Sequence, residues 1–331
     1  MAPAVLSNSI LAFRLEHLRI PYELIPVIKV SLLHTTERIL VLVFCKIFND
    51  DQNVSHTGSW DDIQRLLTFI HVEATRIAQE NDRILLQVDV LLRGTDKQVE
   101  LQESQSNWDH LFYTKHDLSD LPLPGWMHSI PATKLDLEQV GGSNDVSESV
   151  DHVAQYPSAY PSTFPVVALG GTFDHIHSGH KILLSMAAWI ASEKIIVGVT
   201  DDALLGKKSN KEVMEKLPVR IDRVRQFLAL FKPGLEYEIV PITDVYGPTG
   251  WDPNIQALVV SKETLNGASA IAKHREERSL PPLRCFVIDV ISSSSANLEF
   301  EDAEMLRQAK LSSTFIRDWI VARKAKLVRD I

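Results

Sequence analysis

The sequence has few of the residues that mark secreted or membrane proteins. Among its 331 residues only Cys45 and Cys285 are cysteines, and two thiols this far apart cannot build a disulfide framework. A reducing compartment is therefore expected. The longest apolar run, RILVLVFCKIF, is interrupted by Lys46 and falls short of the ~20 residues that cross a bilayer. We expect a soluble protein without a membrane span in the cytoplasm, with the nucleus left open.

An excess of positive charge is also missing. The chain has 34 Lys and Arg residues against 43 Asp and Glu residues, a net charge of −9. The excess of acidic residues lies in residues 1–160, which contain 12 basic and 22 acidic residues. Residues 161–331 contain 22 basic and 21 acidic residues. An acidic segment repels polyanions, and a balanced one lacks the basic surface of a nucleic-acid binder. We expect no nucleic-acid partner, and a small anionic substrate of the second half remains open.

Changes in composition divide the chain into three segments. Residues 1–115 contain three apolar runs, LIPVIKVSLL, RILVLVFCKIF and RILLQVDVLLRG, which we interpret as strands around one amphipathic helix near residues 59–79. Ser59 is the predicted N-cap of this helix. Residues 116–163 are rich in proline, glycine, serine and acidic residues without periodicity, as in a linker. The first segment is predicted to be a small α/β domain of unknown role, and residues 164–331 a second domain.

Strand and helix patterns alternate through the second domain. The apolar runs PVVALG, KIIVGVT, EYEIVPI, QALVVS and RCFVIDVI are separated by helical patterns, and a last helix is expected near residues 313–326. This alternation predicts a parallel sheet with helices on both faces. Ligands of such folds bind at the carboxyl ends of the strands.

The loop after the first of these strands is rich in glycine and histidine. In GGTFDHIHSGH, Gly170 and Gly171 let the backbone turn and approach a ligand. A helix is expected to begin near Ser178, and helix N-termini attract phosphate. His177 and His180, three residues apart, can lie on the same side of the first turn and donate hydrogen bonds to phosphoryl oxygens. The pattern indicates a phosphate site.

A metal site is a weaker interpretation of this loop, and histidines without any ligand would not explain the paired glycines beside them. HIHSGH resembles the H-x-H-x-D-H run of metallo-hydrolases, but Gly179 occupies the position of the aspartate and no later cluster supplies the remaining ligands. We therefore expect no metal held by protein side chains here. The dinucleotide fingerprint G-x-G-x-x-G is absent, and DALLGKKS does not fit the P-loop pattern.

A second anion site is predicted at the last helix. The run KLSSTFIR places Ser312, Ser313 and Thr314 at the expected helix start, and Arg317 follows one turn later. One serine would suffice as an N-cap, whereas three hydroxyl groups beside free backbone N–H groups favour a bound anion.

The two motifs together resemble a known family. GTFDHIHSGH and SSTFIR form the paired signature of the nucleotidylyltransferase superfamily, which has a Rossmann-like α/β fold. Within it, VVALGGTFDHIHSGHK, IIVGVTDDALLGKK, DVYGPTGWDP and LVVSKETLNGASAI resemble eukaryotic phosphopantetheine adenylyltransferase, the half of bifunctional coenzyme A synthase that transfers the adenylyl group. The resemblance covers about residues 164–319. Because the chain has no Walker A sequence, it resembles the stand-alone, fungal-type form rather than the bifunctional one.

The resemblance implies a reaction in coenzyme A biosynthesis and the residues that carry it. ATP and 4'-phosphopantetheine would give dephospho-coenzyme A and pyrophosphate, by in-line attack of the acceptor phosphate on the ATP α-phosphate without a covalent intermediate. Because the acceptor phosphate is already anionic, positioning and charge stabilisation suffice. The implied catalytic residues are His180, Lys208 and His177. The implied ATP-binding residues are Gly170, Gly171, Thr172, Phe173, His177, His180, Ser312, Ser313, Thr314 and Arg317.

For the acceptor, the resemblance implies contacts from Thr172, Lys208, Tyr246 and Asp252, with Lys207 as the alternative to Lys208. Mg²⁺ is expected to arrive with ATP, held mostly by phosphates and water. A complex with other enzymes of coenzyme A biosynthesis is left open.

One departure and two alternative functions accompany this interpretation. Asn266 stands where relatives often carry a basic residue, which leaves the phosphate or adenine contact at that position open. One alternative is another enzyme of the superfamily, moving CMP or AMP to a different acceptor. The other is a scaffold that recruits pathway enzymes without turnover, although the intact HxGH and SST motifs favour activity.

Overall fold

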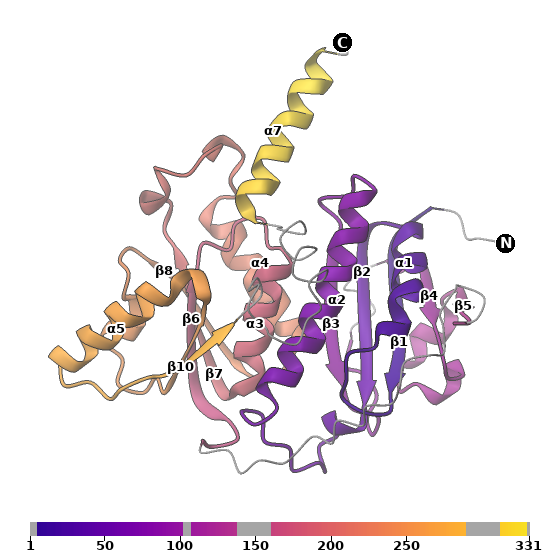
Figure 1. Ribbon diagram of the computed structural model, residues 1–331, viewed down its shortest axis with the longest axis horizontal. Helices are drawn as coiled ribbons and strands as arrows, with labels where there is room; N and C mark the ends of the chain where they lie inside the picture. Colours follow the sequence, from indigo (N-terminus) through magenta and orange to yellow (C-terminus); the bar gives the residue numbers. More distant parts are fainter. Residues whose placement is uncertain (1–4, 102–106, 138–159, 289–311, 330–331) are drawn as a thin grey trace. The chain divides into compact units, whose positions relative to one another are not determined.

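The computed structural model describes residues 5–101, 107–137, 160–288 and 312–329. The chain forms two compact units, residues 1–158 and 159–331, which are described separately (Figure 1). No helix in the described ranges combines the length and the apolar composition that a bilayer span requires.

The second unit contains a five-stranded sheet in the order β10-β9-β6-β7-β8, and every pair of neighbouring strands is parallel. Its strands are β6 (Phe164–Gly171), β7 (Ala191–Thr200), β8 (Glu236–Ile242), β9 (Ala257–Ser261) and β10 (Arg284–Ile288). The chain runs outward from β6 to β7 and β8, then returns to the other side of β6 for β9 and β10. The strand order therefore reverses beside β6, where folds of this type bind their ligands.

Among the described residues of this unit, four long helices accompany the sheet: α3 (Ser178–Ile190), α4 (Leu217–Phe231), α5 (Leu265–Glu277) and α7 (Ser313–Arg329). α3 is buried from Lys181 to Ile190 and packs against α4. On the sheet, Ala168, Ile196 and Leu258 form a core with Ile271 of α5. The neighbouring residues in the strands point to the opposite face. These observations confirm the predicted α/β fold with a parallel sheet.

The first unit contains a second five-stranded sheet, in the order β3-β2-β1-β4-β5, with all neighbouring pairs parallel. Its strands are β1 (Leu6–Leu15), β2 (Thr35–Cys45), β3 (Gln87–Arg93), β4 (His110–Tyr113) and β5 (Ala132–Lys134). Its long helices are α1 (Ile25–His34) and α2 (Trp60–Glu80). The order in which the chain fills this sheet matches that of the second unit, since each sheet grows outward from its first strand on both sides.

The structure corrects three details of the predicted first domain. The run LIPVIKVSLL forms α1 rather than a strand, with Pro26 in the first turn where a missing N–H costs nothing. The first strand is instead β1, in a segment that the hydropathy pattern did not single out. Ser59 occupies the N-cap position of α2, but its hydroxyl donates to the carbonyls of Ser55 and His56 rather than capping the helix.

The predicted linker begins inside the first unit. Residues Ala132–Lys134 form β5 and pair with β4, and Leu121, Leu123 and Met127 are buried. Because this stretch is rich in proline, its composition did not indicate the short edge strand or the buried apolar residues. The first domain therefore continues past residue 115 to at least Leu135, and residues 138–159 of the predicted linker lie outside the described part of the chain.

Candidate active site

The loop between β6 and α3 turns tightly at the carboxyl end of the sheet. Phe173 and His175 both adopt positive φ angles, of 52° and 44°, which are uncommon for residues with side chains. The buried Phe173 ring folds back under the strand end, so that a Cβ on Gly171 would lie 3.1 Å from it. Glycine at position 171 thus lets the ring close the loop against β6.

His177 and His180 stack on each other at the start of α3. Their ring centroids are 3.9 Å apart, and the His180 ring also contacts Phe173, at 5.2 Å. His177 is the N-cap residue with an extended backbone, and a Cβ on Gly179 would lie 3.2 Å from its Cε1. The predicted arrangement of both rings on one side of the first turn is therefore observed.

The two imidazoles are neutral near pH 7. Burial lowers the pKa of His180 to about 4, although the nearby Asp174 carboxylate opposes the shift. Burial, together with the neighbouring His180, holds the pKa of His177 well below its usual range. The Nδ1 atoms of both rings are buried without a hydrogen-bond partner. A buried polar atom left unpaired is costly, and a ligand could satisfy it.

Asp174 joins the β6–α3 loop to the start of α7. Its fully buried carboxylate accepts from Arg317 Nη1 at 2.7 Å and from the Glu215 N–H at 2.9 Å. Its backbone carbonyl accepts from Ser313 Oγ at 2.8 Å. The two helix starts, which the sequence separates by more than 130 residues, therefore meet at this loop.

The hydroxyl groups of the SST run each have a contact in the structure. Ser312 Oγ caps α7 by accepting from the Phe315 N–H, Ser313 Oγ donates to Asp174, and Thr314 Oγ1 accepts from Arg317 Nη2. Arg317 also donates through Nε to the Ser209 carbonyl. Its guanidinium is buried among protein groups, and these contacts hold the loops together, while the predicted phosphate contact of Arg317 stays a prediction.

Lys207 and Lys208 lie exposed in the segment that follows β7. The next two residues are tied to α7, since the Ser209 carbonyl accepts from Arg317 and Asn210 Nδ2 donates to Asp318 Oδ1 at 2.5 Å. The lysine segment is therefore anchored to the same helix start as the β6–α3 loop. Nothing in the geometry favours one lysine over the other.

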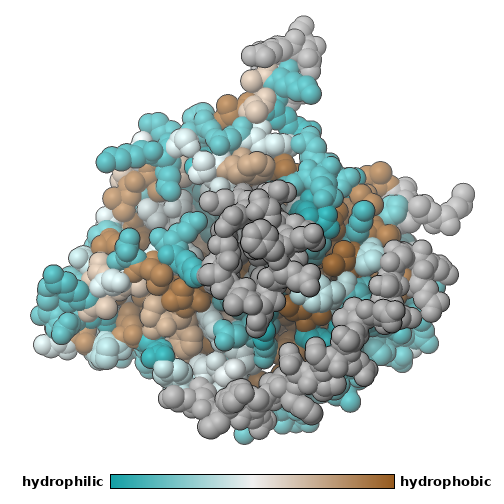
Figure 2. Space-filling view, viewed as in Figure 1, coloured by the Kyte–Doolittle hydropathy of each residue, from teal (hydrophilic) through white to brown (hydrophobic). Residues whose placement is uncertain are grey.

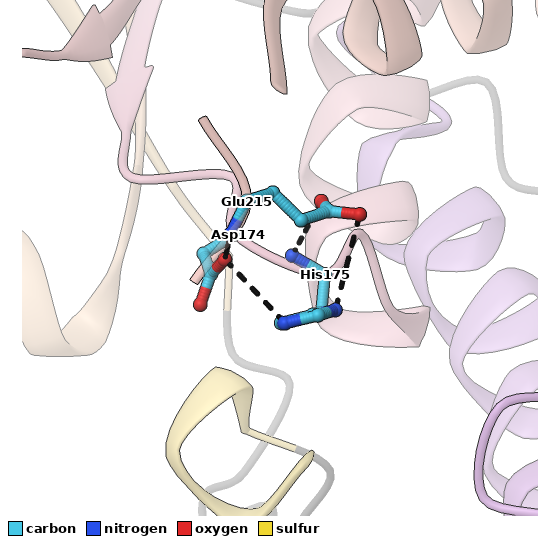
Figure 3. A group of neighbouring side chains, drawn as sticks. All are labelled: Asp174, His175 and Glu215. Carbon is cyan, nitrogen blue, oxygen red and sulfur yellow. Dashed lines mark hydrogen bonds and ion pairs between the residues drawn. The ribbon is translucent and has the colours of Figure 1, made fainter. Parts of the chain in front are cut away.

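Asp174, His175 and Glu215 form a close group whose ligand atoms lie within 4.8 Å of one another (Figure 3). These atoms already have partners. Glu215 accepts from the His175 N–H at 2.9 Å and pairs with Arg223 at 2.8 Å, and the His175 Nε2 lies 2.8 Å from the Val213 carbonyl. With Asp174 paired to Arg317, the group is explained as an anchor between the loop and the residues before α4 rather than as a metal centre.

A small apolar cavity of about 50 Å³ opens beside β6, where the strand order reverses. Its lining includes Gly170, Gly198, Ile242 and Tyr246. The Tyr246 ring also stacks on His274, with centroids 4.0 Å apart. Asp252, the other residue predicted on the acceptor side, is outside this lining, and its carboxylate accepts from the Asn254 N–H in a local turn. Tyr246 thus lines this cavity and Asp252 stabilises a turn, and the predicted acceptor contacts of both residues stay predictions.

Comparison with known proteins agrees with this geometry. The cytidylyltransferase-like family model matches residues 168–318. A phosphopantetheine adenylyltransferase of Saccharomyces cerevisiae is 47% identical over 154 residues, which are 46% of this chain and 48% of the yeast protein. The chain thus spans about half the length of this relative. A phosphopantetheine adenylyltransferase of Pyrobaculum aerophilum is 35% identical over 154 residues, which cover 46% of this chain and 90% of the archaeal protein.

The chain belongs to the phosphopantetheine adenylyltransferase family. The region that the cytidylyltransferase-like model matches contains both helix starts and the loops between them. An uncharacterized protein of Schizosaccharomyces pombe is 33% identical over 246 residues, 73% of this chain and 75% of that protein. Because this match is longer than the second unit, it extends into the first unit, beyond the part that the archaeal member of the family shares.

The contacts of three buried arginines were not predicted from the sequence. Arg220, Arg275 and Arg317 are the largest fully buried side chains in the described part of the chain. Arg275 donates to the carbonyls of Thr249, Asp252 and Pro281, and so braces the loop next to Tyr246. In sequence, α4 and α7 also carry the exposed arginines Arg225 and Arg323, and no local pattern reveals which groups the buried arginines contact. Asn266, the departure noted above, is exposed in the first turn of α5.

Proposed function

We propose that this protein transfers AMP from ATP to 4'-phosphopantetheine, yielding dephospho-coenzyme A and pyrophosphate in coenzyme A biosynthesis. A phosphate oxygen of the acceptor attacks the α-phosphorus of ATP, a new P–O–P bridge forms, and the bond to the β-phosphate breaks. No protein nucleophile is needed, because the acceptor is already anionic. Family membership supports this proposal, as do the paired phosphate-binding motifs.

The observation that carries the proposal is the contact between the two helix starts. Ser313 Oγ donates to the Asp174 carbonyl, so the N-terminus of α7 lies beside the loop that leads into α3. Helix N-termini have free N–H groups and a positive dipole end, and two of them at one loop suit a chain of phosphates. In this proposal the loop from Gly170 to Phe173 and residues 312–314 surround the triphosphate.

His177 and His180 would act on the α-phosphate. Their unpartnered Nδ1 atoms give them free hydrogen-bonding capacity, and an arriving triphosphate favours the protonated form. A histidine that becomes cationic as ATP binds stabilises the extra negative charge of the transition state. This would make His180, with His177 beside it, the main charge-stabilising group.

The acceptor phosphate would lie between Thr172 and the lysine segment. Lys208, or Lys207 one residue earlier, would neutralise it, and Tyr246 at the apolar cavity would contact the pantetheine arm. Asp252 would act through the turn that it stabilises. Mg²⁺ would neutralise the triphosphate through its oxygens, since the Asp174 carboxylate of the loop and the Glu215 carboxylate before α4 are paired with arginines.

A coupled assay of pyrophosphate release tests the proposal. We expect release from ATP with 4'-phosphopantetheine, and none when nicotinamide mononucleotide replaces the acceptor or CTP replaces ATP. Release with CTP but not ATP, or only with another acceptor, would assign the chain to a different reaction of the superfamily. A cytoplasmic location and complexes with other pathway enzymes stay predictions.

A further inference from the structure

Arg220 is a fully buried charged residue outside the motifs discussed so far. It lies in the first turn of α4, and its side chain is 0% exposed. Every nitrogen of its guanidinium donates a hydrogen bond within the second unit. Nε donates to the Glu215 carbonyl at 3.1 Å, Nη1 to two carbonyls, and Nη2 to Asp202 Oδ1 at 2.5 Å. This set of contacts excludes the direct phosphate contact that a cation in this region would otherwise suggest.

The acceptors of Arg220 belong to three separate segments around the site. Nη1 bridges the carbonyls of Thr172, at 2.6 Å, and Thr200, at 2.9 Å. Thr172 directly follows β6, and Thr200 is the last residue of the neighbouring strand β7. The Glu215 carbonyl and the Asp202 carboxylate lie at the two ends of the segment that contains both candidate lysines. One planar group therefore fixes the spacing of the strand ends and both ends of the lysine segment.

The chemistry of these contacts indicates that Arg220 does more than stabilise the fold. Burying the Arg220 guanidinium costs free energy. Its carboxylate partner among the described residues is Asp202, whose side chain is 51% exposed and therefore well solvated. A hydrophobic side chain could fill the same volume more cheaply, but it could not bind three carbonyls of different segments at once. Arginine is suited to this because its fork of donors is rigid and stays charged.

We propose that Arg220 is a positioning residue for adenylyl transfer, holding Thr172 and the lysine segment at the separation that the two reacting phosphates require. The proposal rests on the proposed function for its kinetic consequences. Arg220 touches neither substrate: it acts through the Thr172 carbonyl and through the segment from Asp202 to Glu215. Misplacement of reacting groups by about 1 Å can cost about 10²-fold in rate, so the loss of this brace is expected to lower kcat.

The test compares Arg220→Lys with Arg225→Lys on the full chain. Lysine keeps the charge but cannot reach all four acceptors as a planar fork. For R220K we expect kcat about 10²-fold lower, with the KM for ATP changed less than about threefold, because Arg220 contacts neither the two histidines nor residues 312–314, which would bind most of the triphosphate. Arg225 lies on the same helix with an exposed side chain, and R225K should keep the wild-type constants.

Hydrogen exchange gives a readout that does not need activity. In R220K, peptides covering residues 169–176 and 200–208 should exchange at least about tenfold faster than in the wild type, while residues 265–277 of α5 stay unchanged. A merely structural role would instead speed exchange across the whole second unit. If the wild type proves inactive on ATP and phosphopantetheine, the proposed function fails, but this exchange pattern still decides whether Arg220 braces the loops.

A second variant covers the case in which R220K does not fold. Asp202→Ala removes only the solvated partner of Arg220 and leaves the three carbonyl contacts in place. We expect kcat about tenfold lower, the order of one charge-assisted hydrogen bond, with faster exchange confined to residues 200–208. Wild-type kcat and wild-type exchange in D202A, or in a folded R220K, would overturn the proposal.

Discussion

At the scale of single residues, the stacked histidines are the chemical centre of the account. Burial keeps both imidazoles neutral, yet the Nδ1 atom of each ring has no hydrogen-bond partner. A phosphate bound here can form the hydrogen bonds that these two nitrogen atoms lack in the free protein. The cost of burying the histidines in the free protein is then partly recovered when ATP binds.

Replacing His180 by alanine should lower kcat by about 10²-fold or more, as the loss of one charge-stabilising donor typically does. Steady-state pyrophosphate release measures the change. His128→Ala is the control, because His128 is exposed in the first unit. An unchanged kcat in H180A would assign the charge stabilisation to another residue.

The pKa of His180 predicts that ATP binding takes up protons. In the free protein His180 has a pKa of about 4, and the bound triphosphate raises this pKa. Between about pH 4 and the raised pKa of the complex, His180 therefore holds more of its proton in the ATP-bound protein than in the free protein. ATP affinity should therefore rise as the pH falls through this range, from the pKa of the complex toward about 4. Calorimetry in two buffers of different ionisation enthalpy at pH 6 measures the uptake, and H180A should abolish most of it.

Stability without ATP should change with pH in the opposite sense. Because the folded pKa of His180 lies near 4 and the ordinary value near 6.5, the unfolded chain takes up its proton first as the pH falls. This contribution to stability is complete above about pH 6.5 and is lost progressively toward pH 4. Urea unfolding at pH 7 and pH 5 measures the loss, and a smaller loss is expected for His180→Gln. Equal losses in both proteins would show that His180 is not the group responsible.

Much of this residue-level picture was accessible from the sequence, and part of it was not. The spacing of His177 and His180 predicted their common side, because the geometry of a helix start is local. The uses of Ser313 and Arg317 were not predictable, since their partner Asp174 lies more than 130 residues away. The partners of Arg220 were equally unpredictable, because they are carbonyls of other segments.

At the scale of elements, the ion pair between Asp174 and Arg317 anchors α7. Both side chains are buried, and both carry further hydrogen bonds, as a stable buried pair requires. Their loss would disconnect α7 from the β6–α3 loop and from the Ser209 carbonyl at the same time.

Arg317→Met should destabilise the second unit by about 3–5 kcal/mol, because it leaves the Asp174 carboxylate buried without a cation. Chemical unfolding followed by tryptophan fluorescence measures the change. Arg323→Met, on the exposed part of the same helix, should cost less than about 0.5 kcal/mol. Equal effects of the two substitutions would contradict the anchoring role.

The sequence distinguished helices from strands where an apolar run was bounded by clear helical patterns. PVVALG, KIIVGVT and EYEIVPI became β6, β7 and β8, because short apolar runs between helical patterns indicate buried parallel strands. LIPVIKVSLL is as apolar as those strands but forms α1, since an evenly apolar run does not distinguish a buried helix from a strand.

At the scale of the whole molecule, the two units share a strand order but not a binding loop. After β1 the chain continues as EHLRIPYEL, without any glycine, whereas the equivalent loop after β6 starts from Gly170 and Gly171. At the carboxyl ends of β1 and β4, His116 Nε2 lies 3.5 Å from Glu16 Oε1. In the first unit, a pair of side chains thus lies at the carboxyl ends of these strands, and no glycine-rich loop directly follows β1.

We therefore expect one ATP site per chain. Isothermal titration with ATP and Mg²⁺ should give a stoichiometry near one, and His180→Ala should weaken this single binding event. A second binding event that persists in H180A would indicate that the first unit also binds nucleotide.

The central claim is that the two helix starts hold one triphosphate between them, and a crystal structure of the full chain with bound ATP tests it most directly. The account predicts a ring nitrogen of His180 within about 3.2 Å of an α-phosphate oxygen. It also predicts the β- and γ-phosphates at the N-terminus of α7, beside Ser312 and Ser313. Phosphates bound away from α7, or a His180 ring facing a cavity that holds no phosphate, would contradict it.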